Sequence, residues 1–387
     1  MTGTPDAFDP DWDLFCRVVD NFGDIGVSWR LAKGLAQDHD CAVRLWVDDW
    51  ASFSRLCPAA RSGAERLIAD GVEVRRWTEP FPDVKPAAHV VEAFACELPE
   101  GYLAAMSVRN PQPVWINLEY LSAEDWVEGC HGLASPHPRL PLRKHFFFPG
   151  FTPGTGGLLR EAGLLAVRDA FRADPRGRAD FLRRLGIPQP VEGARCVSLF
   201  AYEQPRIADL LRLWAADAQP TVVLLPEGRV VGDVLRHFGR PDVQVGDVLV
   251  DRALSVVLLP FLDPADYDRL LWACDLNFVR GEDSFVRAQW AASPFVWHIY
   301  EQDDAIHHDK LEAFLARFLV GLDEAAATAA RAFWQAWNGE GDLAASWPAF
   351  ADALPQLALH TRRWSDALAA RPDLASALVQ FSELTVK

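Results

Sequence analysis

The order of hydrophobic and polar positions predicts strands and helices that alternate along most of the chain. Short apolar runs alternate with stretches in which apolar residues recur every three or four positions, as on one face of a helix. The first pair is a strand over 14–19 and a helix from Val27 onward, in which Leu31 and Leu35 recur. Strands that alternate with helices of this length are typical of an α/β fold with largely parallel sheets.

This alternation occurs in both halves of the chain. In the first half, strands are predicted at 14–19, 42–47, 72–77, 88–95 and 113–120. In the second half, strands are predicted at 196–200, 221–225, 254–259, 275–279 and 295–299, and helices at 207–216, 266–274 and 283–292. The repeat is therefore at the scale of a domain, and indicates one Rossmann-like unit after another.

Domain boundaries are expected where this alternation breaks. After Glu128, prolines and glycines lie close together, which predicts irregular chain with one short helix at 179–185. An amphipathic helical tail closes the sequence. The expected parts are an N-terminal Rossmann-like lobe over 1–150, a linker over 151–190, a C-terminal Rossmann-like lobe over 191–357, and a helix at about 358–387 that packs back on the first lobe.

Composition argues against several classes of protein. The 387 residues carry a net charge of −16, which speaks against a nucleic-acid-binding face and suits a cationic partner better. The seven cysteines are scattered without a CxxC pair, so neither a zinc site nor a disulfide framework is expected. No N-terminal signal and no apolar span of bilayer length are visible, so we expect a cytoplasmic protein without a membrane partner.

The strand predicted at 14–19 runs into a glycine-containing turn with two acids, Asp20 and Asp24. In open α/β sheets, the ligand crevice lies beyond the carboxyl ends of the strands. At its mouth, two carboxylates four residues apart can hold a cationic or hydroxyl-bearing group. The structural alternative is that Asp20 merely ends the strand and that Asp24 caps the helix.

A second turn of this kind, 280–284, follows the strand predicted at 275–279. Amide groups at the start of the next helix can bind phosphate, and Arg280 can add a charge-assisted contact. Phosphate would repel Glu282, so this side chain is expected to face a hydroxyl group or the acceptor. The alternative is a solvated acidic turn before a helix that Asp283 or another turn residue caps.

Aromatic residues follow two other strands predicted in the second half. Phe200 and Tyr202 lie at the end of one strand, and Phe261 lies after the end of another. They could stack on a base or sugar ring. For Phe200 and Phe261, the alternative is a place in the hydrophobic core.

Patterns that could hold a metal or a nucleotide by themselves are weak here. The chain has no P-loop and no GxGxxG. Asp11-x-Asp13 and Asp266-x-Asp268 are formally DxD patterns, but we interpret them as capping or solvent-facing residues. The histidines lack the spacing of metal ligands on a helix. No metal site is therefore expected.

Three segments together resemble the EarP family, the bacterial protein-arginine rhamnosyltransferases of translation elongation factor P. They are 15–27, 117–126 and 280–285, and the likeness extends over nearly the whole chain. The resemblance implies a GT-B fold with two lobes facing each other across a cleft. It implies that L-rhamnose moves from dTDP-β-L-rhamnose to one arginine of elongation factor P, with inversion and without a metal or other cofactor. This modification would activate the factor for rescue of ribosomes stalled at polyproline.

The resemblance also implies roles for individual residues. Asp24 matches the general base, Asp20 a second acceptor-side carboxylate, and Glu282 a further essential acid. The positions that match donor-binding residues are Asn21, Phe22, Gly23, Phe200, Tyr202, Phe261, Arg280, Gly281, Glu282, Asp283 and Ser284.

Two other functions remain open from the sequence. A non-catalytic nucleotide-sugar sensor would keep the 280–284 turn but would not need Asp20 together with Asp24. A GT-B transferase with a small-molecule or lipid acceptor would be favoured by an apolar or basic membrane-facing patch on the first lobe.

Overall fold

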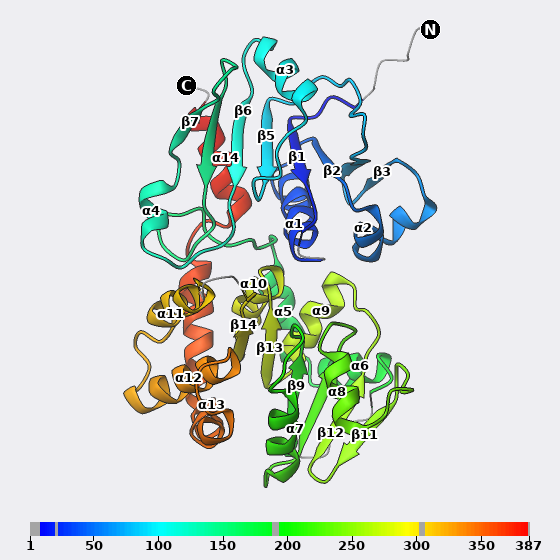
Figure 1. The fold of residues 1–387 in the computed structure, drawn as a ribbon, viewed down its shortest axis with the longest axis vertical. Coiled ribbons are helices and arrows are strands. Elements are labelled where there is room, and N and C mark those ends of the chain that lie inside the picture. The colour runs from blue at the N-terminus through cyan, green and yellow to red at the C-terminus, as the bar shows by residue number, and fades with distance from the viewer. Residues whose placement is uncertain (1–7, 20–21, 188–192, 302–305, 386–387) are drawn as a thin grey trace. The chain divides into compact units, whose positions relative to one another are not determined.

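The chain forms two compact units in a computed structural model that describes residues 8–19, 22–187, 193–301 and 306–385 (Figure 1). Unit 1 comprises residues 1–162 and 368–387, and unit 2 comprises residues 163–367. Residues 151–162 thus belong to unit 1, whereas the following helices belong to unit 2. The chain passes from unit 1 to unit 2 after residue 162 and returns to unit 1 after residue 367.

The described part of unit 1 contains an eight-stranded sheet in the order β3-β4-β2-β1-β5-β6-β8-β7. The six central strands are parallel, and the short edge strands β3 and β7 are antiparallel to their neighbours. The strands are β1 (Trp12–Cys16), β2 (Val43–Val47), β3 (Arg66–Ala69), β4 (Val72–Arg76), β5 (His89–Ala93), β6 (Val114–Leu118), β7 (Ala134–Pro136) and β8 (Arg143–Phe147). The carboxyl ends of the parallel strands therefore lie along one edge of the sheet.

The helices of unit 1 are α1 (Gly23–Asp38), α2 (Trp50–Leu56), α3 (Glu100–Val108), α4 (Trp126–Cys130) and α14 (Leu374–Thr385). Aromatic side chains fill the core beside α3, where the rings of Phe15 and Tyr102 lie 4.7 Å apart. The C-terminal helix α14 packs on α1, and a Cβ atom added at Gly34 would lie 3.5 Å from Ala375. This small residue lets the two helices approach closely.

The described part of unit 2 contains a six-stranded sheet in the order β11-β12-β10-β9-β13-β14, parallel except for the edge strand β11. The strands are β9 (Arg195–Leu199), β10 (Thr221–Leu225), β11 (Val248–Asp251), β12 (Leu254–Leu258), β13 (Leu276–Arg280) and β14 (Phe295–His298). Its helices are α5 (Leu164–Ala173), α6 (Gly177–Arg184), α7 (Ile207–Ala216), α8 (Val231–Phe238), α9 (Pro264–Ala273), α10 (Asp283–Ala291), α11 (Ile306–Phe318) and α12 (Glu324–Trp337). Helix α13 (Leu343–Ala369) ends just beyond the boundary between the units. Each unit is therefore a Rossmann-like α/β layer structure.

The predicted central strands of both halves are confirmed, but their ends differ in one informative place. Strand β1 stops at Cys16, so its predicted extension to Val19 is wrong. The N–H groups of Val18 and Val19 donate to the carboxylates of Asp48 and Asp24, at 2.9 and 2.8 Å, instead of to a neighbouring strand. The chain therefore leaves the sheet early and turns toward α1.

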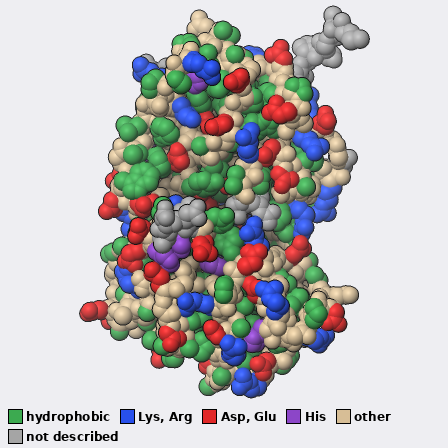
Figure 2. Space-filling view, viewed as in Figure 1, with side chains coloured by type: hydrophobic (Ala, Val, Ile, Leu, Met, Phe, Trp, Pro, Cys, Tyr) green, Lys and Arg blue, Asp and Glu red, His purple; other side chains and the backbone are tan. Residues whose placement is uncertain are grey.

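The prediction of irregular chain after Glu128 is also wrong in part. β8 continues the parallel sheet there, and β7 pairs with it as the edge strand. Within the described ranges, no helix combines the length and the apolar character needed to cross a bilayer. On the face drawn in Figure 2, acidic and basic side chains are interspersed over both units.

Candidate active site

Asp24 is buried in the first turn of α1 and ties three segments of unit 1 together. Its side chain is 2% exposed. The carboxylate accepts a hydrogen bond from the Val19 N–H at 2.8 Å and one from the Tyr120 hydroxyl at 3.2 Å. The N-cap residue of α1 is Phe22, which makes no side-chain capping bond. Asp24 is therefore not a helix cap, and its position supports a site more than the structural alternative does.

Tyr120 was not singled out by sequence reasoning, although it lies inside one of the segments that carry the resemblance. It follows β6 at the carboxyl edge of the sheet, and its ring stacks on Phe94 at 4.4 Å with an interplanar angle of 15°. Its side chain is 45% exposed, so this aromatic pair is accessible to a ligand. The Tyr120 hydroxyl donates to the buried Asp24 carboxylate while the ring remains exposed to solvent. Tyr120 can therefore position this carboxylate beside a ligand.

The loop after β5 holds Phe94 in an unusual backbone conformation. Phe94, Ala95 and Glu97 all have positive φ, at 56°, 53° and 55°. Such angles are costly for residues other than glycine and occur most often at functional sites. The Asn117 side chain stabilises this loop by accepting a hydrogen bond from the Ala95 N–H at 3.0 Å. The loop is thus held rigidly beside Tyr120.

Further polar side chains lie along the same edge of the unit 1 sheet. Glu92 is buried and accepts hydrogen bonds from the indole of Trp115 at 3.0 Å and from Lys144 at 3.4 Å. Burial raises the pKa of Glu119, against the opposing effects of Lys144 and of a hydrogen bond from the Asn117 amide. This edge therefore carries several carboxylates with a single nearby lysine.

The remaining candidates of the first turn are only partly placed. Asp20 and Asn21 lie outside the described residues. Phe22 is half-buried, with the Arg55 guanidinium 6.0 Å from its ring centre. Gly23 is the first residue of α1.

In unit 2, Arg280 ends β13 between two aromatic rings. Its guanidinium carbon lies 4.7 Å from the ring centre of Phe200 and 4.6 Å from that of Tyr202. The side chain is only 7% exposed. Phe200 is placed there by strand pairing, because its N–H donates to the Phe278 carbonyl of the neighbouring strand. Cation–π contacts at these distances hold a guanidinium in a defined orientation.

The turn after Arg280 is locked by its own short side chains. Ser284 accepts a hydrogen bond from the Arg280 N–H at 3.0 Å and donates one to the Arg280 carbonyl. Gly281 has φ of 60°, and its carbonyl accepts a hydrogen bond from the Trp297 indole at 2.9 Å. The serine and the glycine together fix the path of the backbone into α10.

Glu282 occupies the N-cap position of α10 without capping the helix through its side chain. Asp283 is the first helical residue, so the capping alternative proposed for it does not hold. The first amide groups of α10 and its dipole favour an anion at this end of the helix. The turn thus combines a helix N-terminus with the buried cation Arg280.

A neutral histidine lies against Tyr202 and the guanidinium. The Nδ1 atom of His298 accepts a hydrogen bond from the Tyr202 N–H at 3.3 Å. Burial lowers the pKa of His298 to about 4, and the charges of Arg280 and His307 act in the same direction. His298 therefore adds no charge beside Arg280 at neutral pH.

Phe261 is half-buried and lies beyond β12. In the sheet, β10 and β9 separate β12 from β13. Phe200, Tyr202 and Arg280 are therefore brought together by adjacent strands, whereas Phe261 lies further along the same edge.

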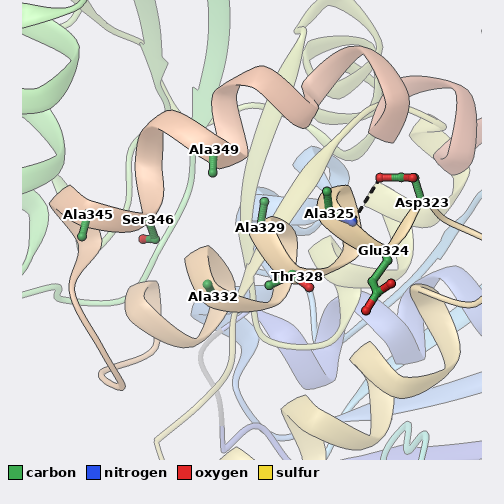
Figure 3. A pocket seen from close by; sticks show the side chains of 9 residues that line it. All are labelled: Asp323, Glu324, Ala325, Thr328, Ala329, Ala332, Ala345, Ser346 and Ala349. Atoms are coloured by element: carbon green, nitrogen blue, oxygen red, sulfur yellow. Dashed lines mark hydrogen bonds between the residues drawn. The ribbon is translucent and has the colours of Figure 1, made fainter.

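A hollow elsewhere in unit 2 does not suit a sugar diphosphate. It lies between α12 and α13 and has a volume of about 690 Å³ (Figure 3). Its lining consists mainly of alanines and contains the carboxylates of Asp323 and Glu324, of which Asp323 caps α12. Carboxylates would repel a phosphate group. We therefore place the candidate donor site at the 280–284 turn.

One aspartate of each DxD pattern makes a buried ion pair with an arginine. Asp13 is buried and binds Arg44 through both carboxylate oxygens, at 2.6 and 2.7 Å. Asp268 binds Arg287 in the same way, at 2.8 and 2.7 Å. The expectation that these two aspartates cap or face solvent is wrong, because each neutralises a buried arginine. No cluster of three or more candidate metal-binding side chains occurs within the part of the chain that the structure describes.

Comparison with known proteins identifies the family. Residues 12–383 match the family described as Elongation-Factor P (EF-P) rhamnosyltransferase EarP. Two relatives named protein-arginine rhamnosyltransferase come from Pseudomonas putida and Pseudomonas aeruginosa. They are 53% and 52% identical to this chain over 370 residues, which is 96% of this chain and 98% of each relative.

Comparison with solved structures indicates the same family. One is described as the structural basis for EarP-mediated arginine glycosylation of translation elongation factor EF-P. It is 40% identical, covers 97% of this chain and 99% of its own, and superposes with a TM-score of 0.71. A UDP-glucosyltransferase from Polygonum tinctorium, 11% identical with a TM-score of 0.50, covers 98% of this chain and 99% of its own, and shares the fold alone. The fold is GT-B, and the chain belongs to the EarP family, as an enzyme of the protein-arginine rhamnosyltransferase type.

Proposed function

We propose that this enzyme transfers L-rhamnose from dTDP-β-L-rhamnose to one arginine side chain of elongation factor P. The observation that carries the proposal is a pair of strand–turn–helix junctions with opposite charge. One buries the carboxylate Asp24, and the other buries the guanidinium of Arg280. A cationic acceptor matches the first junction, and an anionic donor matches the second. The relatives' names support arginine and rhamnose as the groups that are joined.

At the acceptor, the chemical difficulty is the charge of the guanidinium. Arginine keeps its proton at any working pH, so an ordinary aspartate cannot remove that proton beforehand. In our proposal, Asp24 and Asp20 hold the guanidinium in a fork geometry, and Asp24 accepts the proton only as the N–C bond forms. Tyr120 orients Asp24 through its hydroxyl group.

At the donor, the departing diphosphate needs positive charge. Arg280 and the first amides of α10 supply it, so the proposed reaction does not depend on a metal ion. Phe200 and Tyr202, which orient Arg280, flank the nucleotide, and Phe261 adds apolar surface along the same edge. Glu282 faces the sugar or the acceptor. Attack from the face opposite the departing diphosphate inverts the anomeric carbon.

The test is the intact mass of elongation factor P after incubation with the enzyme and dTDP-β-L-rhamnose. We expect a shift of one deoxyhexose, no shift when the acceptor arginine is replaced by lysine, and an unchanged rate in the presence of EDTA. An NMR assignment of the new anomeric centre tests inversion. Growth reporters with polyproline stretches test whether the modified factor rescues stalled ribosomes.

The same assay separates the rival functions. A nucleotide-sugar sensor would bind the donor without any mass shift. A transferase with a small-molecule acceptor would consume donor in a cell extract freed of elongation factor P. Either result would overturn the proposed acceptor.

A further inference from the structure

A hollow of unit 1 lies at the opposite edge of the sheet from Asp24. Its walls include His89, Val114 and Arg143, which begin β5, β6 and β8. Asp24 and Tyr120 lie beyond the carboxyl ends of the parallel strands, so a five-residue strand, about 16 Å, separates the two places. The hollow has a volume of about 610 Å³, within the range of roughly 300–1,000 Å³ for small-molecule sites. The proposed transfer reaction does not use it.

Basic side chains gather in this hollow, although the chain carries a net charge of −16. Arg109, Arg143, His89 and His145 all line it. Among the described residues, the side chains of Arg109 and Arg143 have no carboxylate within ion-pair distance. An arginine pair without acidic partners is unusual on a protein with 54 acidic residues. Its charge is available to an anion.

Two polar atoms in the hollow are buried without a partner. The Nη1 atom of Arg109 and the Nδ1 atom of His89 are shielded from solvent, and neither makes a hydrogen bond within the described ranges. Leaving such a group without a hydrogen-bond partner is unfavourable, and more so when the group is charged. The His89 ring is held in place by stacking on Trp12 at 4.5 Å. Both atoms are therefore placed to bind a ligand that brings oxygen acceptors.

The rest of the lining is mainly apolar, with Gln112 and Thr385 as the exceptions. Pro111, Pro113, Leu140, Pro141 and Trp115 line the hollow beside the cations. The combination of a few fixed polar groups with apolar walls is typical of small-molecule sites. A bare inorganic ion would leave these walls in contact with water.

We propose that this hollow is a second binding site, for a small molecule that carries a phosphate group beside an apolar ring. The two guanidinium groups bind the phosphate oxygens, since arginine matches the geometry of phosphate through paired N–H donors. His89 donates or accepts the remaining hydrogen bond, and the ring lies against the prolines and Trp115. The site lies entirely within unit 1 and is independent of the proposed transfer reaction.

Phenyl phosphate is the probe, titrated calorimetrically into the full chain with Arg280→Gln, so that the 280–284 turn does not take up the phosphate. We expect saturable binding that Arg109→Gln or Arg143→Gln weakens at least about tenfold, as expected for loss of a hydrogen bond to a charged group. The matched control is Arg139→Gln, because Arg139 is exposed, pairs only loosely with Glu100 at 3.9 Å and does not line the hollow. This control should bind phenyl phosphate with unchanged affinity.

Two further titrations define the ligand class. Inorganic phosphate and benzoate should each bind at least about tenfold more weakly than phenyl phosphate, because inorganic phosphate lacks the ring and benzoate has a singly charged carboxylate in place of the phosphate. Absence of saturable binding would overturn the proposal, and so would an affinity that neither arginine substitution changes. Equal affinity for inorganic phosphate or for benzoate would overturn the ligand class. Because Arg143 is exposed at the start of its strand, Arg143→Gln keeps the test valid if Arg109→Gln fails to fold.

Discussion

The two units end a central strand in the same kind of turn but bury opposite charges there. In unit 1 the buried group is Asp24, at 2% exposure, and in unit 2 it is Arg280, at 7%. Both residues lie at the carboxyl edge of a parallel sheet, where α/β folds bind their ligands. The backbone junction is common to both units, so the side chain buried at each junction sets which charge it can receive.

The two turns also differ in what holds the buried group. Asp24 is held by the nearby Val19 N–H and by the distant Tyr120 hydroxyl, whose ring stacks on Phe94 in a loop with three left-handed residues that are not glycine. The turn after Arg280 is held locally, by Ser284 and by the left-handed Gly281. The acceptor turn therefore depends on the rest of unit 1, whereas the donor turn depends mainly on its own sequence and on two flanking rings.

The largest expected effect comes from removing the charge of Asp24. Asp24→Asn keeps the shape and the hydrogen bond from Val19 but cannot accept a proton. We expect kcat to fall by about 10³-fold, in the range for loss of a general base, while the Kd of dTDP-rhamnose stays within about twofold. Asp83→Asn, at an exposed loop position, is the matched control. Near-normal turnover of Asp24→Asn would show that Asp24 does not accept the proton, and unit 1 would then have no carboxylate opposed in function to Arg280.

A second prediction tests whether His298 adds a positive charge beside Arg280. The pKa of His298 is lowered from 6.5 to about 4, so the unfolded chain binds more protons between these pH values. Stability is therefore fully present above pH 6.5 and is lost as the pH falls toward 4, by up to about 3 kcal/mol. In His298→Asn, which keeps an acceptor for the Tyr202 N–H, this part of the pH dependence should vanish.

Urea unfolding at pH 7 and pH 5 measures the effect as a difference between the two proteins. Other histidines with lowered pKa values, such as His89 and His131, titrate in both proteins and cancel. An identical loss of stability in wild type and variant would mean that the pKa of His298 is the same in the folded and the unfolded chain. His298 would then carry a positive charge beside Arg280 at pH 5.

The third prediction concerns donor binding. Arg280→Gln removes the buried cation, and we expect the Kd of dTDP to rise about thirtyfold, about 2 kcal/mol, as for a hydrogen bond to a charged group. Arg240→Gln is the control, because Arg240 is exposed in the same unit. If Arg280→Gln binds dTDP normally but loses turnover, Arg280 acts on the departing diphosphate only in the transition state.

Much of this architecture could be predicted from local pattern alone. The central strands are short apolar runs, and both functional turns follow such runs directly. β8 could not be found in this way, because Arg143, Lys144 and His145 interrupt the apolar pattern of a strand next to the edge of the sheet. Tertiary pairing with β6 decides its structure. The prediction failed where a strand's partners, and not its own residues, make it a strand.

For the candidate site too, local sequence does not show which distant residues are partners. Asp24 and Arg280 were predicted because each lies within a recognisable turn. Their partners lie far away in sequence: Tyr120 is 96 residues from Asp24, and Phe200 is 80 residues from Arg280. The strained loop at Phe94 carries no glycine that would signal its left-handed backbone. Only the fold shows which aromatic side chain positions which charge.

The smallest predicted effect tests that long-range dependence. Tyr120→Phe keeps the ring stacked on Phe94 but removes the hydrogen bond to Asp24. The loss of about 1 kcal/mol should lower kcat about fivefold and leave the Kd of the donor unchanged. Because the carboxylate loses a partner that favours its charged form, the acidic limb of the pH–rate profile should shift to higher pH. In Asp24→Asn, the further change Tyr120→Phe should have no additional effect on kcat. Independent, additive losses would show that Tyr120 contacts the acceptor directly, and the acceptor turn would then be no more dependent on distant residues than the donor turn.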